Sequence, residues 1–160
     1  MTIKVGDKMP SVTLRHLTAE GVQAVPSDDY FKGKKVAVFG LPGAYTRTCS
    51  SRHLPGYVAN SAALKAKGID EIACVSVNDA FVMNVWGKEH NAAGKVTMLG
   101  DGSCELTQAL GLTVDRTEAG MGIRSQRYSM VVEDGVVKEL NVEPSGEYGV
   151  SSAEAMVERR

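Results

Sequence analysis

The sequence predicts an α/β fold: a mixed central β-sheet flanked by helices, with an N-terminal β extension and a C-terminal hairpin followed by a helix. Two observations predict it. Continuous apolar runs alternate with segments of helical periodicity through the middle of the chain, which is typical of parallel strands joined by crossover helices. The pair Asp134-Gly135 then separates two β-rich runs, which indicates an antiparallel hairpin at the end of that series.

The elements up to the middle of the chain follow from local patterns. The runs "MPSVTLRHL" and "GVQAVPSDDYF" are β-like, with a turn at Glu20-Gly21, and form the N-terminal extension. The run "KKVAVFGL" is apolar without alternation, so a strand covered on both faces is expected there. One helix is expected from Ser50 to Lys67, because apolar residues recur every four positions until Gly68. Pro55 should bend its first turns.

The second half repeats this order. Strands are expected at "EIACVSVN" and "KVTMLGD", and each is followed by a helix, "AFVMNVWGKEH" and "CELTQALG". Candidate N-caps are Asn78 or Asp79 for the first helix and Asp101 or Ser103 for the second. The hairpin "RYSMVVEDGVVKELNVE" precedes a last helix in "SSAEAMVERR", where Ser151 and Glu154 are spaced as a capping box.

Composition bounds the class of protein. The 160 residues suit one domain, 1–160, and 43% apolar with 23% charged residues is ordinary for a globular chain. A net charge of -1 provides no field that would attract nucleic acid or anionic lipid. No stretch approaches the length of a membrane span, and the N-terminus "MTIKVGDKMP" resembles neither a signal nor a transit peptide. A soluble, cytoplasmic protein without nucleic-acid or membrane partners is therefore expected.

The cysteines point to intracellular thiol chemistry. Cys49, Cys74 and Cys104 are widely spaced and odd in number, unlike a secreted disulfide framework. No CxxC pair is present, so neither a zinc ribbon nor a dithiol oxidoreductase of usual spacing is supported. Each thiol is then either a buried apolar side chain or a redox group.

Cys49 has the strongest functional signal. It follows the strand in "FGLPGAYTRTCSSRHLPG" and begins the next helix, and in open α/β sheets chemistry is found outside the carboxyl ends of parallel strands. A helix N-terminus favours a thiolate. For any thiol, however, a pKa lowered from about 8.5 to roughly 6 raises the thiolate fraction at neutral pH only about thirtyfold. A fast enzyme therefore also needs groups that orient the substrate and stabilise developing charge.

The stretch Pro42-Gly43-Ala44-Tyr45-Thr46-Arg47-Thr48-Cys49 resembles the P-x-x-x-T-x-x-C signature of peroxiredoxins. The string "PGAYTRTCS…HLPGY" is similar to the type II group, to which mammalian peroxiredoxin 5 also belongs, and the likeness extends from about Lys4 to Gly146. It implies a thioredoxin-like fold and a thiol-dependent peroxidase with no metal or organic cofactor. It also implies a homodimer with a contact near the active-site loops.

The same resemblance assigns roles to residues. Cys49 would attack hydrogen peroxide or an alkyl hydroperoxide and become a sulfenic acid. Thr46 would bind the sulfur and the peroxide, Arg127 would contact both, and Pro42 would shield the sulfur from water. Members of the group usually carry Phe and Pro where Tyr45 and Arg47 stand here. Tyr45 keeps the aromatic bulk for a dimer contact, and Arg47 is expected to point to solvent.

The reductive half of the cycle stays open from sequence. By resemblance to plant type II members, Cys74 is a candidate resolving cysteine, which would require the start of the Cys49 helix to unwind. Direct reduction by glutathione and glutaredoxin, or reduction involving thioredoxin, is the other route. Cys104 is a third candidate, because its predicted position at a helix start favours a low pKa.

Three further residues have expected positions, and two rival functions would use Cys49 differently. His53 is expected on the helix surface, Arg124 either supports the site or pairs with a surface carboxylate, and Trp86 is expected in the core or at an interface. A non-enzymatic redox-sensing module would use Cys49 only as a modifiable thiol. A cysteine hydrolase would need a positioned base and an oxyanion site, for which the sequence offers no clear candidates.

Overall fold

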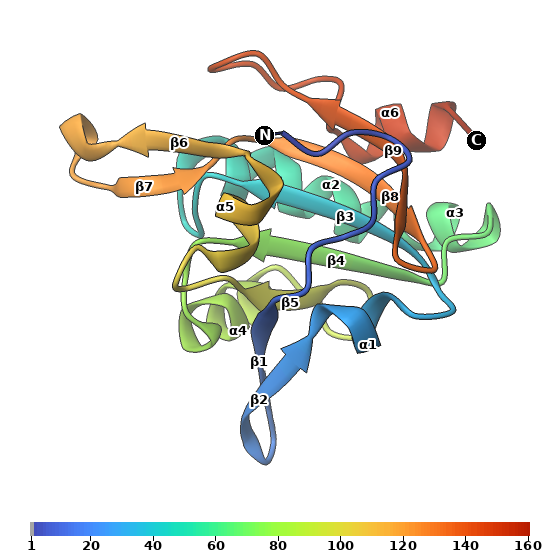
Figure 1. Cartoon of the computed structure of the whole chain (residues 1–160), viewed down its shortest axis with the longest axis horizontal. Helices are drawn as coiled ribbons and strands as arrows, with labels where there is room; N and C mark the ends of the chain where they lie inside the picture. Colours follow the sequence, from blue (N-terminus) through green and yellow to red (C-terminus); the bar gives the residue numbers. More distant parts are fainter. Residues whose placement is uncertain (1) are drawn as a thin grey trace.

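A computed structural model describes residues 2–160, and its centre is a seven-stranded sheet with strand order β2-β1-β5-β4-β3-β8-β9 (Figure 1). The strands are β1 (Thr13–Thr18), β2 (Gly21–Pro26), β3 (Lys35–Leu41), β4 (Glu71–Ser76), β5 (Thr97–Gly100), β6 (Thr113–Arg116), β7 (Gly122–Ser125), β8 (Tyr128–Glu133) and β9 (Val136–Val142). The helices are α1 (Ser27–Phe31), α2 (Leu54–Ala59), α3 (Ser61–Ala66), α4 (Ala80–Glu89), α5 (Glu105–Leu110) and α6 (Ala153–Glu158). Two short turns complete the set: a π-helical turn η1 (Cys49–His53) and a 3₁₀ turn η2 (Thr117–Ala119).

The predicted mixed sheet is confirmed. β3, β4 and β5 run parallel, and β8 lies antiparallel to β3 with Gly40 opposite Tyr128. The carboxyl ends of β3 and β4 therefore meet the start of β8 at one edge of the sheet, on the left of Figure 1. Asp134 and Gly135 both have positive φ, 48° and 80°, as the predicted type I′ turn between β8 and β9 requires.

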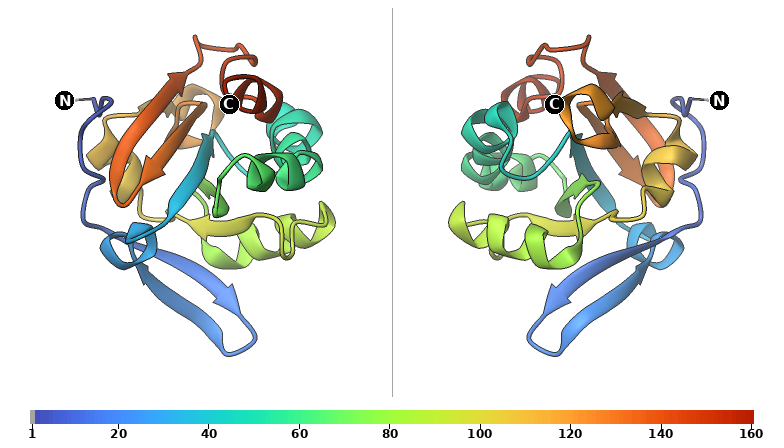
Figure 2. Two further views of the ribbon diagram at one scale, coloured as in Figure 1. Left: turned by 90° about the vertical axis from the view of Figure 1, so that its right-hand side faces the viewer. Right: turned by 90° about the vertical axis from the view of Figure 1, so that its left-hand side faces the viewer.

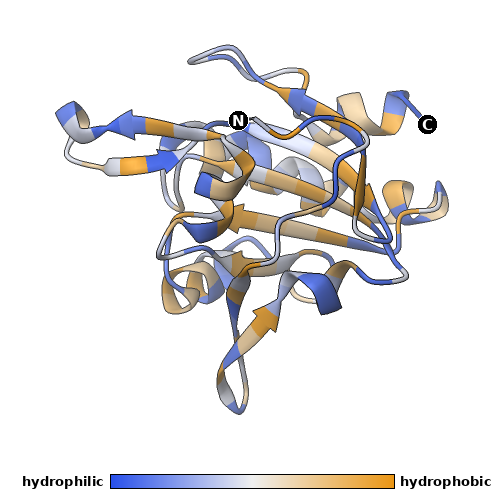
Figure 3. Ribbon diagram, viewed as in Figure 1, coloured by the Kyte–Doolittle hydropathy of each residue, from blue (hydrophilic) through white to orange (hydrophobic). Residues whose placement is uncertain are grey.

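Helices cover both faces of the sheet (Figure 2). Along β3 the side chains alternate: Phe39 and Leu41 pack with α2, α3, α4 and α6, whereas Val36 and Val38 pack with α1, α5 and the N-terminal segment. Two apolar cores result, and the central strands are coloured hydrophobic along most of their length in Figure 3. Within residues 2–160, no helix combines the length and the apolar character needed to cross a bilayer.

The expected helix from Ser50 to Lys67 is divided into η1, α2 and α3. Pro55 explains the first division. In a regular α-helix its ring would collide with the carbonyl of Ser51, and it has no N–H to donate. The wider turn avoids this, and the N–H of Leu54 reaches back five residues to the carbonyl of Cys49. The expected bend at Pro55 thus takes the form of a π-helical turn that begins at Cys49.

Other local predictions were shifted or incomplete. The segment "SDDYF" forms the short helix α1 after β2, and the β6–β7 hairpin was not anticipated because its two four-residue strands carry no long apolar run. Asp79 caps α4 as expected, and Asp101, not Ser103, binds the first N–H groups of α5.

The predicted capping box of Ser151 and Glu154 was wrong, because the helix begins one residue later and the position three residues after its N-cap is Ala155. Ser152 is the N-cap of α6 and accepts from the N–H of Ala155. Ser151 is turned inward and bonds to Glu143 instead.

Candidate active site

Cys49 lies at the beginning of η1, eight residues beyond the end of β3, and its side chain is fully buried. The intervening loop contains Tyr45 in a left-handed conformation, with φ 64°, which is rarely adopted outside glycine, asparagine and aspartate. The turn thereby changes the chain direction between the sheet and the helical segment. As predicted, Cys49 lies outside the carboxyl ends of the parallel strands.

Arg127 contacts the sulfur. Its Nη2 donates to Cys49 Sγ at 3.2 Å. Arg127 directly precedes β8, and the register of β8 against β3 brings the start of β8 to the end of β3, where the Cys49 loop begins. The antiparallel pairing is therefore what unites two residues that are far apart in the chain. At this distance the guanidinium donates a charge-assisted hydrogen bond to the sulfur.

His53 is part of the site, and the expectation that it lies on the helix surface was wrong. Its side chain is fully buried, and Arg127 Nη1 lies 2.8 Å from its Nδ1. Since a guanidinium can only donate, Nδ1 must accept; Nε2 then carries the proton and donates to the carbonyl of Ser151 at 3.1 Å. Burial, and next the charge of Arg127, lower the pKa of His53 to about 3, against the opposing effect of the Ser151 bond.

The loop before Cys49 contains the other predicted residues. Thr46 Oγ1 donates to the carbonyl of Gly43 at 2.7 Å, so its hydroxyl proton is used within the loop and its oxygen lone pairs are free to accept. Pro42 lies beside Thr48 and Arg127. Arg124 donates to the carbonyls of Met121 and, at 3.4 Å, Pro42, so it stabilises the loop. Among residues 2–160 it forms no ion pair with a carboxylate.

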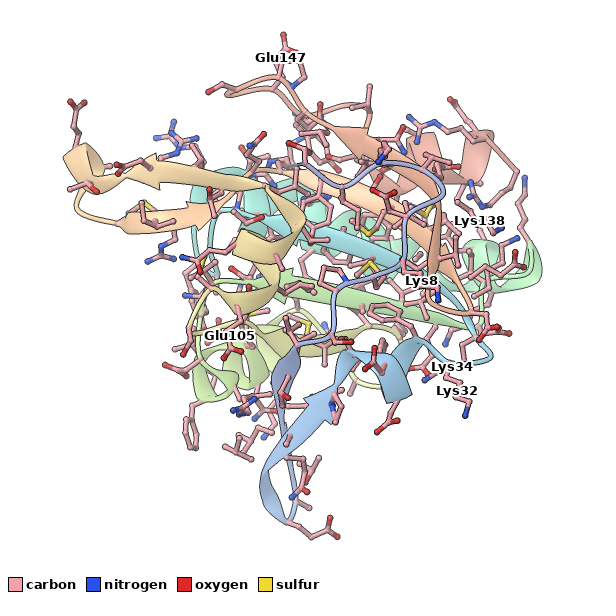
Figure 4. The ribbon with its side chains drawn as sticks, viewed as in Figure 1. Lys8, Lys32, Lys34, Glu105, Lys138 and Glu147 are labelled. Carbon is pink, nitrogen blue, oxygen red and sulfur yellow. The ribbon has the colours of Figure 1, made fainter. Side chains whose placement is uncertain are left out.

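Arg127 lines a pocket of about 170 Å³. Pro42 and Thr48 form one side, Val114 and Arg116 of β6 another, and the loop after β9 closes the rest. In Figure 4 the side chain of Glu147 on that loop points away from the protein. The unanticipated β6–β7 hairpin thus supplies a wall of the site.

Cys74 and Cys104 have different environments. Cys74 is fully buried in the middle of β4, in the same apolar core as Cys49. Burial, and then the neighbouring Cys49, raise the pKa of Cys74 well above its ordinary value, although Arg127 acts in the opposite direction. Cys104 precedes α5, but its pKa is raised by burial and by Asp101, so the expected low pKa at a helix start is wrong.

The remaining expectations for nearby residues are resolved. Arg47 is exposed to solvent, as expected. Trp86 is fully buried and donates from Nε1 to Ser50 Oγ at 2.9 Å, so it belongs to the core. Residues 2–160 hold no group of three or more His, Cys, Asp or Glu side chains arranged to bind a metal ion.

The sequence did not point to Glu143, and it suggested a helix cap for Ser151, which instead bonds to Glu143. The Glu143 carboxylate accepts from the N–H groups of Gly149 and Ser151 and from the Ser151 hydroxyl, at 2.6 to 2.8 Å. Burial alone would raise its pKa, but these hydrogen bonds lower it below the ordinary value. The sequence contained no periodic signal for this contact, because it joins two loop segments.

Comparisons with known proteins agree with this geometry. The profile of the Redoxin family matches residues 4–157. Peroxiredoxin-2E-2, chloroplastic, of Oryza sativa subsp. japonica is 48% identical over 98% of this chain and 72% of its own length.

Solved structures show the same fold. The crystal structure of reduced Prx3 in complex with H2O2 from Vibrio vulnificus is 49% identical, with a TM-score of 0.95 over 99% of each chain. Peroxiredoxin 5 from Alvinella pompejana is 32% identical, with a TM-score of 0.85 over 99% of each chain. The chain therefore belongs to the Redoxin family and, within it, to the type II peroxiredoxins, which are thiol-dependent peroxidases.

Proposed function

We propose that Cys49 is the peroxidatic residue of this peroxidase and that Arg127 stabilises both its thiolate and the departing oxygen of the hydroperoxide. The observation that carries the proposal is the 3.2 Å contact between Arg127 Nη2 and Cys49 Sγ beside a pocket. The thiolate attacks the terminal oxygen of H2O2 or an alkyl hydroperoxide. The S–O bond forms as the O–O bond breaks, sulfur is oxidised by two electrons to a sulfenic acid, and the leaving oxygen takes a proton to give water or an alcohol.

Two further residues bind and protect the reactants in this proposal. Thr46 donates to the Gly43 carbonyl, which leaves its oxygen to accept the O–H of the peroxide. Pro42 covers one side of the entrance and keeps bulk water from the sulfur. Arg127 is already in place at the sulfur, so it needs no rearrangement to donate to the leaving oxygen as negative charge develops there, and this added interaction accelerates the reaction. A resident metal or organic cofactor has no part in these steps.

We propose that Cys74 resolves the sulfenic acid. Its thiol would attack Cys49 sulfur, form a disulfide and release water, and a glutathione/glutaredoxin or thioredoxin system would then reduce that disulfide. The shared core of the two cysteines supports this route. Cys74 is unreactive in the closed structure, since it is buried and its pKa is raised, so the turn η1 must open first. Direct attack of glutathione on the sulfenic acid is the competing outcome.

A homodimer in the cytoplasm completes the proposal. Exposed aromatic and aliphatic side chains support an interface: Tyr45 on the active-site loop is 50% exposed, and Phe81 and Val85 lie one turn apart on α4 at 61% and 49%. Three free cysteines are consistent with a reducing compartment. Sedimentation of wild type and Tyr45→Glu tests the interface, and cell fractionation tests the location, which for the rice relative is named as the chloroplast.

Peroxide consumption by wild type, Cys49→Ser, Arg127→Ala and Cys74→Ser tests the chemistry, with glutathione/glutaredoxin or thioredoxin as reductant. Cys49→Ser should be inactive, and Arg127→Ala should lose about a hundredfold or more in the rate of Cys49 oxidation. Activity of Cys49→Ser equal to wild type would overturn the proposal. If Cys74→Ser turned over as fast as wild type, and oxidised wild type showed no Cys49–Cys74 disulfide in non-reducing mass spectra, the reductive step would belong to an external thiol.

A further inference from the structure

Arg127 is held from two sides by residues of the same helical turn. Its Nη2 donates to Cys49 Sγ at 3.2 Å, and its Nη1 donates to His53 Nδ1 at 2.8 Å. Cys49 and His53 begin and end η1, so their side chains reach the guanidinium from one face of the turn. A long arginine side chain has several rotatable bonds, and the second contact restricts it to the position in which Nη2 meets the sulfur.

The partner of Arg127 is uncharged. His53 is enclosed by Phe39, Tyr57 and Tyr148, with ring centroids 4.9, 5.6 and 5.4 Å away, and by the Ser151 carbonyl. Arg127 is the charged group in direct contact with the ring, and it opposes protonation. The imidazole is therefore neutral, with its proton on Nε2.

We propose that His53 is a positioning residue for Arg127: it supplies a neutral acceptor that fixes the guanidinium while leaving its full positive charge directed at the Cys49 sulfur. A carboxylate in the same place would also fix Arg127, but it would form an ion pair and cancel much of the potential that favours the thiolate. The inference deepens the proposed function, because it rests on the role of Arg127 there.

A second set of contacts sets the tautomer of His53. Its Nε2 and the hydroxyl of Tyr57 both donate to the Ser151 carbonyl, at 3.1 and 2.9 Å. Ser151 is in turn fixed by the Glu143 carboxylate, and the N–H of Glu143 donates to the carbonyl of Arg127 at 2.9 Å. The loop that follows β9 thus orients His53 from one side and the Arg127 backbone from the other.

Three substitutions at His53 separate positioning from charge. Asn places Oδ1 close to the position of Nδ1 and remains a neutral acceptor, Asp provides a charged acceptor of the same shape, and Leu provides none. The readout is the second-order rate constant for Cys49 oxidation by H2O2, followed by the fluorescence of Trp86, the single tryptophan of the chain. His16→Leu is the matched control, since His16 also contacts a backbone carbonyl but lies on β1.

We expect His53→Leu to lose about tenfold to a hundredfold in this rate constant, His53→Asn to recover most of the loss, and His16→Leu to match wild type. His53→Asp should remain slower than His53→Asn, and its rate should rise with pH at a higher midpoint, because the added anion opposes thiolate formation. A merely structural role for His53 would not produce this difference between Asn and Asp. Circular dichroism and thermal unfolding identify any variant that has to be measured at a lower temperature to remain folded.

Equal rates and equal pH midpoints for Asn and Asp would overturn the inference, as would a wild-type rate for His53→Leu. Arg127→Ala distinguishes failure of the proposed function from failure of the positioning role of His53. If Arg127→Ala reacts as fast as wild type, the proposed function itself fails. If Arg127→Ala is slow but His53→Leu is not, only the positioning role fails. In the Arg127→Ala background, His53→Leu should cause no further loss.

Discussion

Replacing Ser50 with alanine should accelerate formation of the Cys49–Cys74 disulfide without changing the rate at which Cys49 reacts with peroxide. Cys74 is buried in β4 and Cys49 is held in η1, so the turn has to open before the two sulfurs can bond. Ser50 Oγ accepts from Trp86 Nε1 at 2.9 Å, and this bond ties the turn to α4. The substitution therefore destabilises the closed form of η1 relative to its open form.

The expected increase in the population of the open turn follows from the burial of Trp86. The indole is fully buried, so without Ser50 Oγ its N–H has no partner in the closed state, which costs about 1 to 3 kcal/mol. In the open state water can reach the indole, and the cost is relieved. Alanine has a higher helix propensity than serine by about 0.5 kcal/mol, which stabilises the closed turn and offsets part of the cost of the unpaired Trp86 N–H. The remaining 0.5 to 2.5 kcal/mol, roughly, corresponds to a rise in the open population of about twofold to seventyfold.

The assay mixes reduced protein with one equivalent of H2O2, quenches with acid and alkylating reagent at successive times, and measures each thiol and disulfide species by mass spectrometry. Ser51→Ala is the matched control, because Ser51 is the exposed neighbour in the same turn. We expect the sulfenic acid of Ser50→Ala to appear at the wild-type rate and to convert to the disulfide more than twofold faster. A disulfide that forms equally fast in Ser50→Ala and wild type would show that opening of this turn does not limit the step.

Three further outcomes are expected. Between about pH 6.5 and pH 4, the free energy of unfolding should fall on acidification by up to about 1.4 kcal/mol per pH unit, because the unfolded chain takes up a proton that His53, with its pKa of about 3, does not bind in the folded state. Urea titrations measure this slope, which should largely disappear in His53→Leu between about pH 6.5 and pH 5.5; below that range carboxylates such as Glu143, whose pKa is lowered in the folded state, add their own loss, and an unchanged slope above pH 5.5 in His53→Leu would contradict the account. Gly40→Ala should destabilise the fold by about 1 to 3 kcal/mol or more, because the new Cβ would lie 2.1 Å from Cε1 of the buried Tyr128; an unchanged urea midpoint would contradict the close packing. Asp101→Asn should cost about 1 to 3 kcal/mol in thermal unfolding and leave peroxide reactivity intact, because one oxygen that accepts from Leu106 N–H or from Thr107 is replaced by a donor; loss of reactivity at full stability would refute this account.

Much of the fold was predictable because its strands have strong local signals. "KKVAVFGL" and "EIACVSVN" are buried on both faces, and Asp134-Gly135 has the backbone conformation that its residue types prefer. The weaker elements were not predictable. The β6–β7 hairpin consists of short, half-buried strands whose pairing depends on their position against the rest of the chain. Ser151 and Ser152 are adjacent and equally good caps, and the inward turn of Ser151 toward Glu143 decides between them.

The site divides in the same way. Cys49, Thr46 and Pro42 lie within one local motif, so their order along the chain already places them near one another, and the resemblance identified Arg127. His53 was misjudged because helical spacing tells which side of a helix a residue faces but not what covers that side. The cover includes Arg127, Tyr148 and Ser151, which come from segments far along the chain.

By itself, the sequence determined the alternation of strands and helices, the thiol at the end of a strand and the family whose motif surrounds it, because each depends on neighbours in the chain. Only the tertiary structure decided which groups meet at the sulfur. The antiparallel register of β8 against β3 brings Arg127 to Cys49, and burial together with the charge of Arg127 keeps His53 neutral. Contacts between distant segments depend on how the whole chain packs, and no local pattern encodes them.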